Sequence, residues 1–270
     1  MRSFSDRVAV VTGAASGIGQ VLSECLAQRG CHLALVDINE AGLAETARRI
    51  TRLGRSVSQH CVDVANKEQM AILPGAVIHK HRHVHILVNN AGVSLAGPFE
   101  TCPIRDLEWI VGVNLWGMFY GCAFFLPALR NADEGHIVNV SSDFGLFGLP
   151  TKTAYCLTKF AIRGFSEALR AELHNSRIGL TCVYPGAVDT GLIRNMRTWD
   201  TAKRDIETRF VANRGIPVTT VAERIVQGIE RNTGRVLIGG DTYLIDAFTR
   251  LMPSITNKLV ARFKDLLPFI

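Results

Sequence analysis

A tyrosine and a lysine, Tyr155 and Lys159, stand four residues apart in the sequence. Residues 152–173 have the pattern of a helix, so the two side chains share one face of it. Tyrosine has a pKa of about 10 in water, and a nearby ammonium group favours the phenolate and lowers that pKa. The pair is therefore suited to moving a proton near neutral pH. The same spacing also arises by chance, so the interpretation depends on what accompanies it.

A glycine-rich turn, TGAASGIG at residues 12–19, follows an apolar run at 7–11 and opens a predicted helix at 17–29. Its first glycine permits a tight turn, its second lets a pyrophosphate approach the helix N-terminus, and its third permits close helix packing. The spacing is GxxxGxG instead of the commoner GxGxxG, and a turn that serves packing alone is the alternative. The candidate cofactor contacts here are Gly13, Ser16, Gly17, Ile18 and Gly19.

An acid ends the second predicted strand, at Asp37, about 20 residues after the glycines. A carboxylate at this place can bind the ribose 2′-hydroxyl of a dinucleotide and would repel a 2′-phosphate. Ile38 follows it, where an arginine or lysine would be needed to bind that phosphate. The pattern predicts NAD over NADP, with a helix-capping aspartate as the alternative.

Apolar runs alternate with helical segments along the chain. Strands are expected at 7–11, 32–36, 57–62, 86–89, 136–140, 178–184 and 235–238, and helices at 17–29, 40–53, 104–130 and 152–173. A capping box at Thr220 and Glu223 is expected to open a further helix. This order predicts an α/β fold, a doubly wound, Rossmann-like parallel sheet of seven strands with helices on both faces. No linker or repeat interrupts it, so residues 1–270 are expected to form one domain.

These motifs together resemble the classical short-chain dehydrogenase/reductase family over about residues 6–240. The matching segments, in family order, are TGAASGIG (12–19), Asp63-Val64, NNAG (89–92), Asn114, VNVSS (138–142), YCLTK (155–159) and PGAVDTG (185–191). The resemblance implies an oxidoreductase that passes a hydride between a nicotinamide cofactor and an alcohol or ketone.

The resemblance also implies roles for individual residues. Tyr155 would be the general acid/base, and Lys159 would lower its pKa and hold the nicotinamide ribose. Ser142 follows the fifth strand, at the sheet edge where such folds bind ligands, and would hydrogen-bond the substrate oxygen. Asn114 would kink its helix and support a water relay, with a satisfied core amide as the alternative. Further implied cofactor contacts are Asp63, Val64, Asn90, Ala91, Gly92, Pro185, Gly186, Val188 and Thr190.

Composition narrows the class of protein. The chain has 270 residues, 47% of them hydrophobic, with a net charge of +6 and a mean hydropathy of +0.17. A sizeable core is expected, and the positive charge is too diffuse to predict a nucleic-acid partner. The seven cysteines form no CxxC pair, which favours reduced thiols and a cytoplasmic protein, and the N-terminal apolar run is too short for a signal peptide.

The stretch 109–129 carries no charge and is long enough to span a bilayer. A helix buried on several sides has the same pattern and is favoured. In the resembled family the matching helix packs on the sheet and often joins subunits, which implies a homodimer or homotetramer.

Two segments depart from the family pattern. Pro74-Gly75 interrupts an expected helix and predicts a kink or an early stop. His79, His81, His83 and His85 alternate, so on an extended segment they would share a face. A metal site is conceivable there, but no acid or cysteine accompanies them, so a solvated turn is favoured and no metal is predicted. His85 stands where the family commonly has an acid.

The sequence constrains the identity of the substrate less than it constrains the reaction or the cofactor. The expected lid at 191–215 has six basic and three acidic residues, which suits either a solvated face or an acidic or CoA-linked substrate. An apolar pocket is predicted from Phe144, Leu146, Phe147, Leu149, Met196 and Trp199. It favours a hydrophobic secondary alcohol or ketone, such as a steroid, retinoid or lipid-derived compound. The alternatives are an NADPH-dependent carbonyl or 3-ketoacyl reductase and, outside enzymes, an NAD-binding regulator or a membrane-associated protein.

The tail at 243–270 lies beyond the motifs. It has the pattern of an amphipathic, basic helix pair split by Pro253. Packing over the substrate cleft, joining of subunits and peripheral membrane contact all remain open, with packing or oligomerisation favoured.

Overall fold

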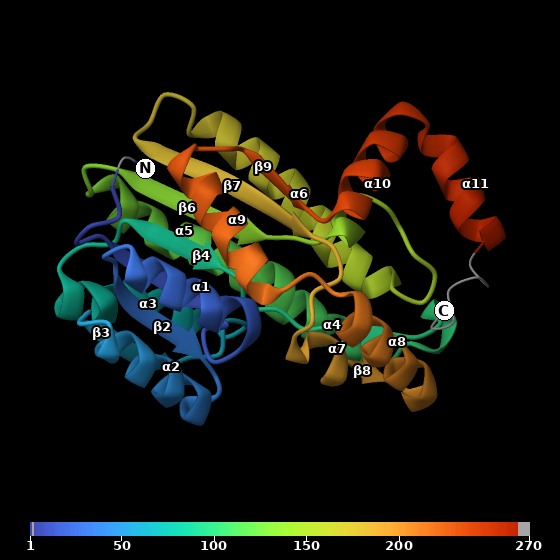
Figure 1. Cartoon of the computed structure of the whole chain (residues 1–270), viewed down its shortest axis with the longest axis horizontal. Helices are drawn as coiled ribbons and strands as arrows, with labels where there is room; N and C mark the ends of the chain where they lie inside the picture. The colour runs from blue at the N-terminus through green and yellow to red at the C-terminus, as the bar shows by residue number, and fades with distance from the viewer. Residues whose placement is uncertain (2, 264–270) are drawn as a thin grey trace.

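Seven parallel strands form one sheet in the order β3-β2-β1-β4-β6-β7-β9. The computed structural model describes residues 1 and 3–263 (Figure 1). The strands are β1 (Val8–Thr12), β2 (His32–Asp37), β3 (Val57–Cys61), β4 (Ile86–Asn89), β6 (Gly135–Val140), β7 (Ile178–Pro185) and β9 (Arg235–Ile238). Two further strands, β5 (Leu95–Ala96) and β8 (Arg197–Thr198), pair separately and were not expected from the sequence. The predicted doubly wound parallel sheet is confirmed.

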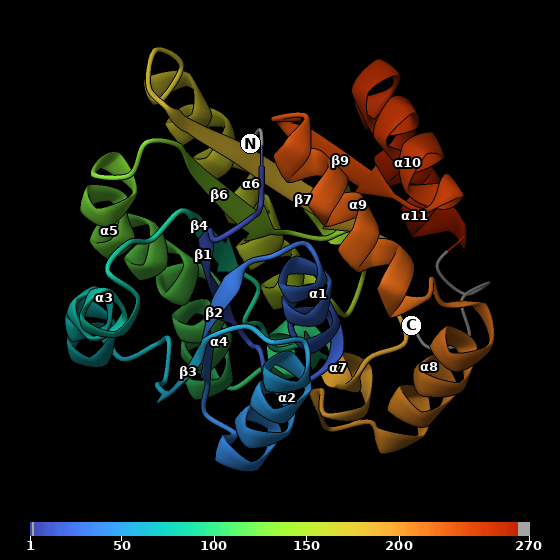
Figure 2. The same cartoon turned by 60° about the vertical axis from the view of Figure 1, so that its left-hand side comes forward.

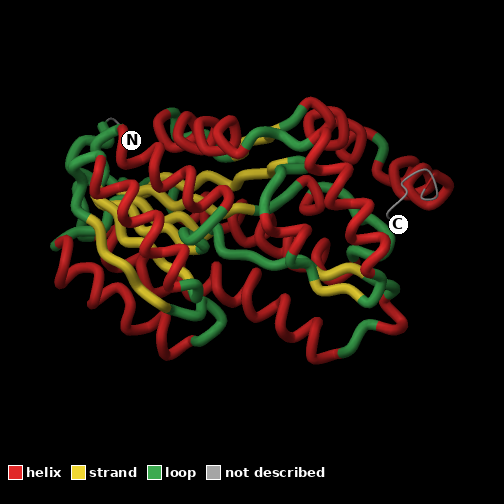
Figure 3. Tube along the Cα trace, turned by 60° about the horizontal axis from the view of Figure 1, so that its bottom comes forward, coloured by secondary structure: helices red, strands yellow, loops and turns green. Residues whose placement is uncertain are grey.

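Helices cover both faces of this sheet, so the strands lie between two helical layers (Figure 3). The helices are α1 (Gly17–Gln28), α2 (Glu40–Arg52), α3 (Lys67–His81), α4 (Ile104–Val111), α5 (Gly117–Arg130), α6 (Thr153–Glu172), α7 (Gly191–Arg194), α8 (Thr201–Arg214), α9 (Val218–Glu230), α10 (Gly240–Leu251) and α11 (Pro253–Phe263). Helices α1, α2 and α9 pack on one face, and α3, α5 and α6 on the other. Alternate residues of β1 supply the two cores, since Val11 faces α1 and Val10 faces the opposite layer.

The strand order reverses on either side of β1, which has β2 and β4 as its neighbours. Ligands of such sheets bind in the crevice at this switch point, beyond the carboxyl ends of the strands. The hydroxyl of Thr12, the last residue of β1, ties the crevice together. It accepts hydrogen bonds from the backbone N–H groups of Asn90 and Ala91 at 3.0 Å each and donates to the carbonyl of Val88 at 3.3 Å.

The uncharged stretch forms a continuous helix, in which α4 and α5 are joined by a π-helical turn, η2 (Gly112–Trp116). This helix, Ile104–Arg130, has 27 residues and is long and apolar enough to cross a membrane. One side of it packs on the sheet, through Cys122 and Phe125. Trp116 and Phe119 on its other side are exposed. The helix therefore packs on the sheet, on α3 and on α6, as expected of a buried helix, while one side of it remains open.

Two expected helix boundaries differ from the observed ones. Helix α3 continues through Pro74 to His81 and does not stop early, because Met70, Leu73, Pro74 and Val77 form a buried stripe that holds it on the sheet. Helix α9 begins at Val218, directly after Pro217, so the predicted capping box lies inside the helix and does not open it. Proline fixes the backbone conformation that precedes the helix and so moves its start.

The alternating histidines do not share one extended face. His79 and His81 lie in α3, and the His81 Nε2 forms a 2.8 Å hydrogen bond with the Ser58 hydroxyl. His85 directly precedes β4, and its Nδ1 accepts the Val8 N–H at 3.1 Å. His81 and His85 therefore serve separate local contacts, while the rings of His83 and His85 lie 5.9 Å apart.

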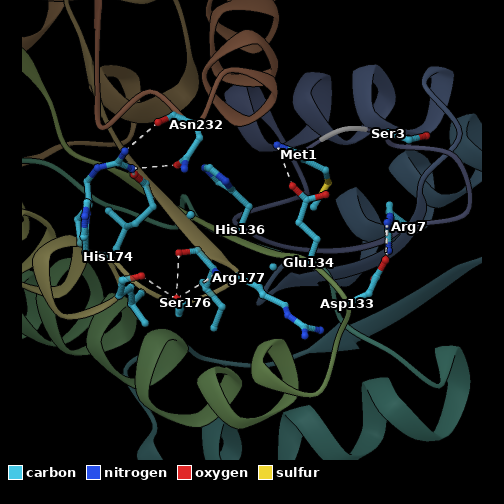
Figure 4. A pocket seen from close by; sticks show the side chains of 16 residues that line it. Met1, Ser3, Arg7, Asp133, Glu134, His136, His174, Ser176, Arg177 and Asn232 are labelled. Carbon is cyan, nitrogen blue, oxygen red and sulfur yellow. Dashed lines mark hydrogen bonds and ion pairs between the residues drawn. The ribbon is translucent and has the colours of Figure 1, made fainter.

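A polar cavity of about 550 Å³ lies at the amino ends of β6 and β7 (Figure 4). Figure 4 shows Arg7 facing Asp133 and the Met1 ammonium facing Glu134, and both contacts are ion pairs. The Arg7 guanidinium lowers the pKa of Asp133 to about 2. These charges join the chain start to the loop before β6, at the edge of the sheet away from the switch point.

Candidate active site

A second cavity, of about 790 Å³, lies at the carboxyl edge of the sheet. It brings together most of the predicted site residues from five separate segments of the chain. Those that line it are Gly13, Ser16, Gly17, Ile18, Asn90, Ala91, Gly92, Ser142, Phe144, Phe147, Leu149, Tyr155, Lys159, Pro185, Gly186, Val188 and Thr190. The glycine-rich turn and the Tyr–Lys pair therefore open onto one space.

Tyr155 and Lys159 lie on α6 and are both buried. The Lys159 Nζ donates a 3.0 Å hydrogen bond to the carbonyl of Val140, at the end of β6, and lies 5.5 Å from the centre of the Tyr155 ring. Burial lowers the pKa of Lys159 to about 8, since the low-dielectric surroundings disfavour its charged form.

The pKa of Tyr155 moves in the direction opposite to the sequence expectation. Burial raises it well above the ordinary value, and the nearby Asp143 carboxylate raises it further. A hydrogen bond with Ser142 acts in the lowering direction but is the smaller effect. Desolvation of the phenol dominates in the protein by itself, and the lowering by Lys159 stays a proposal.

The adjacent serines Ser141 and Ser142 have different partners. The Ser141 hydroxyl donates a 2.8 Å hydrogen bond to the backbone carbonyl of Lys159, so it fixes α6 on the end of β6. The Ser142 hydroxyl donates to the Asp143 carboxylate at 2.7 Å and accepts the Phe144 N–H at 3.2 Å. The geometry is consistent with the choice of Ser142 over Ser141 as the substrate-facing hydroxyl.

Asn114 lies in the π-helical turn between α4 and α5 and is buried. Its side chain accepts the Val93 N–H at 2.8 Å and donates to the Val93 carbonyl at 3.0 Å and to the Thr158 hydroxyl at 3.2 Å. These three bonds connect the loop after β4 to α6. The alternative of a satisfied core amide thus describes its side chain, and the water relay stays a proposal.

The glycine-rich turn has the shape that a phosphate cradle requires. Gly13 and Gly17 have φ angles of +67° and +55°, and a Cβ on Gly19 would lie 2.1 Å from the Gly13 carbonyl oxygen. Larger residues would therefore strain or fill the turn. Ser16 precedes the first turn of α1 and makes no side-chain capping bond, which leaves this helix end to an anion.

Asp37 stands at the end of β2, beside the glycine-rich turn. Its carboxylate accepts the N–H groups of Ala15 and Asn39 at 3.0 Å each. Asn39, and not Asp37, caps α2, so the helix-capping alternative does not describe Asp37. The glycine cradle and this carboxylate together fit the diphosphate and the adenosine ribose of a dinucleotide.

Three predicted pocket residues do not line the cavity. Leu146 points into the core beneath α6, because the 3₁₀ turn η3 (Asp143–Gly145) directs its neighbours Phe144 and Phe147 outward instead. Met196 is buried with its sulfur 3.1 Å from the Lys152 ammonium. Trp199 packs on Gly97, because the pairing of β8 with β5 brings the two segments together.

Two implied adenine contacts also lie outside the cavity lining. The Asp63 carboxylate accepts the Ala65 N–H at 2.9 Å, which shapes the loop after β3. Val64 is buried, and a Cβ on Gly117 would lie 2.7 Å from its side chain. Their contact with a cofactor stays a proposal.

Sequence reasoning missed a buried ion pair in the wall of the cavity. The Lys152 ammonium lies 2.7 Å and 2.9 Å from the two carboxylate oxygens of Glu207 in α8. The side chains are only 1% and 7% exposed. The pair connects the start of α6 to the lid, and no local pattern indicates a partner 55 residues away.

The tail supplies another wall. Ile245 of α10 and Leu259 and Val260 of α11 line the cavity. Packing over the cleft, one of the three options left open by the sequence, is therefore what the described part of the tail does. Residues 264–270 of the predicted tail lie outside the described residues.

A switch-point cavity with a phosphate cradle and a Tyr–Lys pair defines a nicotinamide-dependent oxidoreductase. Residues 7–201 match the short chain dehydrogenase family, and the chain belongs to that family. It is 38% identical to the Mycobacterium tuberculosis protein SadH over 97% of this chain and 96% of that one. It is 31% identical to estradiol 17-beta-dehydrogenase 11 of Rattus norvegicus, over 98% of this chain and 84% of that one.

A solved structure shares the fold closely. It is a short chain dehydrogenase/reductase from Burkholderia phymatum in complex with NAD, with 28% identity and a TM-score of 0.88. The match covers 95% of this chain and 97% of that chain.

Glu207→Gln should destabilise the protein, because it leaves the Lys152 ammonium buried without a counter-charge. A loss of about 3–5 kcal/mol in the free energy of unfolding, measured by urea denaturation, is expected. Replacing both residues, Lys152→Met with Glu207→Met, should recover most of it. Asp189→Asn is the matched control, since it breaks the exposed lid pair with Arg194 and should cost less than about 1 kcal/mol. A Glu207→Gln variant as stable as this control would contradict the assignment.

Proposed function

We propose that the protein is a single-domain enzyme that transfers a hydride between NAD(H) and a hydrophobic secondary alcohol or ketone. The observation that carries this proposal is the meeting of Tyr155, Lys159 and Ser142 with the glycine-rich turn in one largely apolar cavity. A regulator without enzymatic activity is expected to have lost part of this catalytic set, which the chain retains in full.

The proton chemistry belongs to Tyr155. Its phenol would donate a proton to the ketone oxygen during reduction and take it back from the alcohol during oxidation. Lys159, fixed by Val140, would hold the nicotinamide ribose and provide positive charge beside the phenol. When bound, NAD supplies the hydride carrier and, in its oxidised form, a further positive charge that favours the phenolate. Burial of Tyr155 keeps bulk water from this proton.

The walls of the cavity favour an apolar substrate. The residues opposite the catalytic helix are mainly hydrophobic, and they come from η3, the lid and the tail. They are Phe144, Phe147, Leu149, Leu192, Ile193, Phe210, Val211, Ile245, Leu259 and Val260. A steroid-, retinoid- or lipid-like alcohol or ketone suits this lining. The name of the rat relative, estradiol 17-beta-dehydrogenase 11, supports the same class.

The exposed face formed by η2, α5 and α6 supports a homodimer or homotetramer. Trp116, Phe119 and Phe160 are between 39% and 47% exposed there, and the Trp116 ring stacks on Tyr120. Apolar patches of this kind mark contacts between subunits.

The outer side of the tail is also apolar. Leu244 and Leu251 of α10 are 73% and 79% exposed, and Figure 2 shows α10 and α11 at the rim of the molecule. Five of the seven cysteines are buried and free, which fits a cytoplasmic protein, and the apolar outer side of the tail fits peripheral membrane contact.

Sedimentation with and without anionic vesicles tests the aromatic face as a subunit contact and the tail as a membrane contact. A dimer or tetramer that pellets with vesicles is expected, whereas a monomer, or no pelleting, would reject the corresponding surface.

Tyr155→Phe should lower kcat by about 10²–10⁴-fold, because the variant has no phenolic proton to transfer. Its affinity for NAD, measured by calorimetry, should stay close to that of the wild type. Tyr243→Phe is the matched control, since its hydroxyl lies on the exposed side of α10, near Arg224. Normal turnover by Tyr155→Phe on a panel of steroid, retinoid, aliphatic and acyl alcohols would overturn the mechanism.

Asp37→Ala should relax the preference for NAD, because it removes both the ribose hydrogen bond and the repulsion of a 2′-phosphate. The ratio of kcat/KM for NAD to that for NADP should fall about tenfold to a hundredfold. Asp37→Asn keeps the hydrogen-bond acceptor that supports Ala15 and should show a smaller change. A wild-type enzyme that already prefers NADPH would contradict the NAD proposal and favour a carbonyl or 3-ketoacyl reductase.

A further inference from the structure

A buried ion pair lines a part of the cavity whose other walls are apolar. The pair consists of Lys152 and Glu207, and both residues belong to the lining. Glu207 shares one face of α8 with Phe210 and Val211, because three or four residues separate them, and these two also line the cavity. The carboxylate therefore lies among the apolar walls of the lid.

The hydrogen bonds within this pair use every donor and leave acceptors over. The Lys152 ammonium has three N–H groups and three acceptors nearby, the two Glu207 oxygens at 2.7 Å and 2.9 Å and the Met196 sulfur at 3.1 Å. Each Glu207 oxygen has two lone pairs and accepts one hydrogen bond from Lys152, and no other described residue donates to it. A substrate group that comes beside the pair therefore meets a hydrogen-bond acceptor.

The other charges of the cavity disfavour an acidic substrate. Asp143 and Asp241 add two carboxylates to that of Glu207, and no arginine stands among the described residues of the lining. The second cation there is Lys159, whose ammonium is bonded to the Val140 carbonyl and is assigned to the nicotinamide ribose. A carboxylate or phosphate on the substrate would therefore meet like charges without a free cation to offset them.

The pair also lies close to the reacting phenol. Lys152 directly precedes α6, three residues before Tyr155, which is about 4.5 Å along a helix axis. Burial above all raises the pKa of Tyr155, and the Glu207 carboxylate is among the groups that raise it further. A second polar group on a substrate can therefore reach Glu207 while the reacting oxygen is at Tyr155.

We propose that Glu207 is a specificity-determining residue that accepts a hydrogen bond from a second hydroxyl group of the substrate. The preferred substrate is then an apolar alcohol or ketone that carries a further hydroxyl and no acidic group. A buried acceptor discriminates well, because a substrate without the hydroxyl displaces water from the carboxylate and returns no hydrogen bond. This inference rests on the proposed alcohol–ketone chemistry and narrows its substrate class.

Matched ketones test the inference on the wild-type enzyme. The parent is the apolar ketone with the highest kcat/KM in the panel, and its derivatives carry either a hydroxyl or a carboxylate at successive positions. The best hydroxylated ketone should exceed the parent in kcat/KM about tenfold to a hundredfold, through a lower KM. The carboxylates should be poorer than the parent. Equal turnover of parent and hydroxylated ketones, or a preference for a carboxylate, would refute the inference and leave the proposed function standing.

Two double variants assign the preference to Glu207. Lys152→Met with Glu207→Met removes the acceptor and leaves no unpaired buried charge, so the preference for the hydroxylated ketone should almost disappear. Lys152→Met with Glu207→Gln keeps a neutral carbonyl acceptor and should retain part of the preference. Asp189→Asn, which breaks the exposed lid pair, should retain it in full.

The ratio of the two KM values separates recognition from a structural role. An ion pair that only fastened the lid would alter KM for the parent and the hydroxylated ketone alike, and their ratio would not change. An unchanged ratio in the variant with two methionines would therefore contradict the role of Glu207. No turnover of any alcohol or ketone by the wild type would instead refute the proposed function, and the inference would fall with it.

Discussion

The attachment of α6 to the end of β6 is the constraint on which the site depends. Two hydrogen bonds secure it beside the cavity: the Ser141 hydroxyl donates to the Lys159 carbonyl, and the Lys159 ammonium donates to the Val140 carbonyl. Both bonds are buried, so their geometry is not exchanged with water. They bring residues from two separate elements to one edge of the sheet. Tyr155 and Ser142 face each other because the helix cannot rotate without breaking both.

Burial then sets the electrostatics of that edge. It lowers the pKa of Lys159, raises that of Tyr155 and raises that of Asp143, so each group is shifted toward its neutral form. Burial therefore makes each charged form less favourable here than it would be in water. At neutral pH only Tyr155 is neutral, because a pKa of about 8 leaves Lys159 mostly charged and a pKa of about 6 leaves Asp143 mostly ionised. A bound oxidised nicotinamide would add positive charge and so lower the cost of forming the phenolate.

The sequence predicted the parts of the structure that depend on local pattern. Strand β1 and the turn after it follow from a β-branched run and three glycines, and Tyr155 and Lys159 share a face by spacing alone. Contacts between distant segments could not be predicted. Trp199 lies on Gly97 because two dipeptide strands pair, and Lys152 meets Glu207 across 55 residues. The upward shift in the pKa of Tyr155 could not be predicted for a related reason, since burial is a property of the whole fold.

The cavity has a side that carries Tyr155, Lys159 and Ser142 and a side formed by the lid and the tail. The sequence predicted the first, catalytic half but not the second, substrate half, because different kinds of segment form them. The catalytic half consists of strand ends and one helix, whose positions follow from the sheet. The substrate half comes from the lid and the tail, and a buried ion pair holds the lid to α6. Such a pair gives little net stability but is costly to break, so it fixes one lid position more than it strengthens the fold. The position of the lid therefore depends on a contact between segments 55 residues apart, which no local pattern in the sequence indicates.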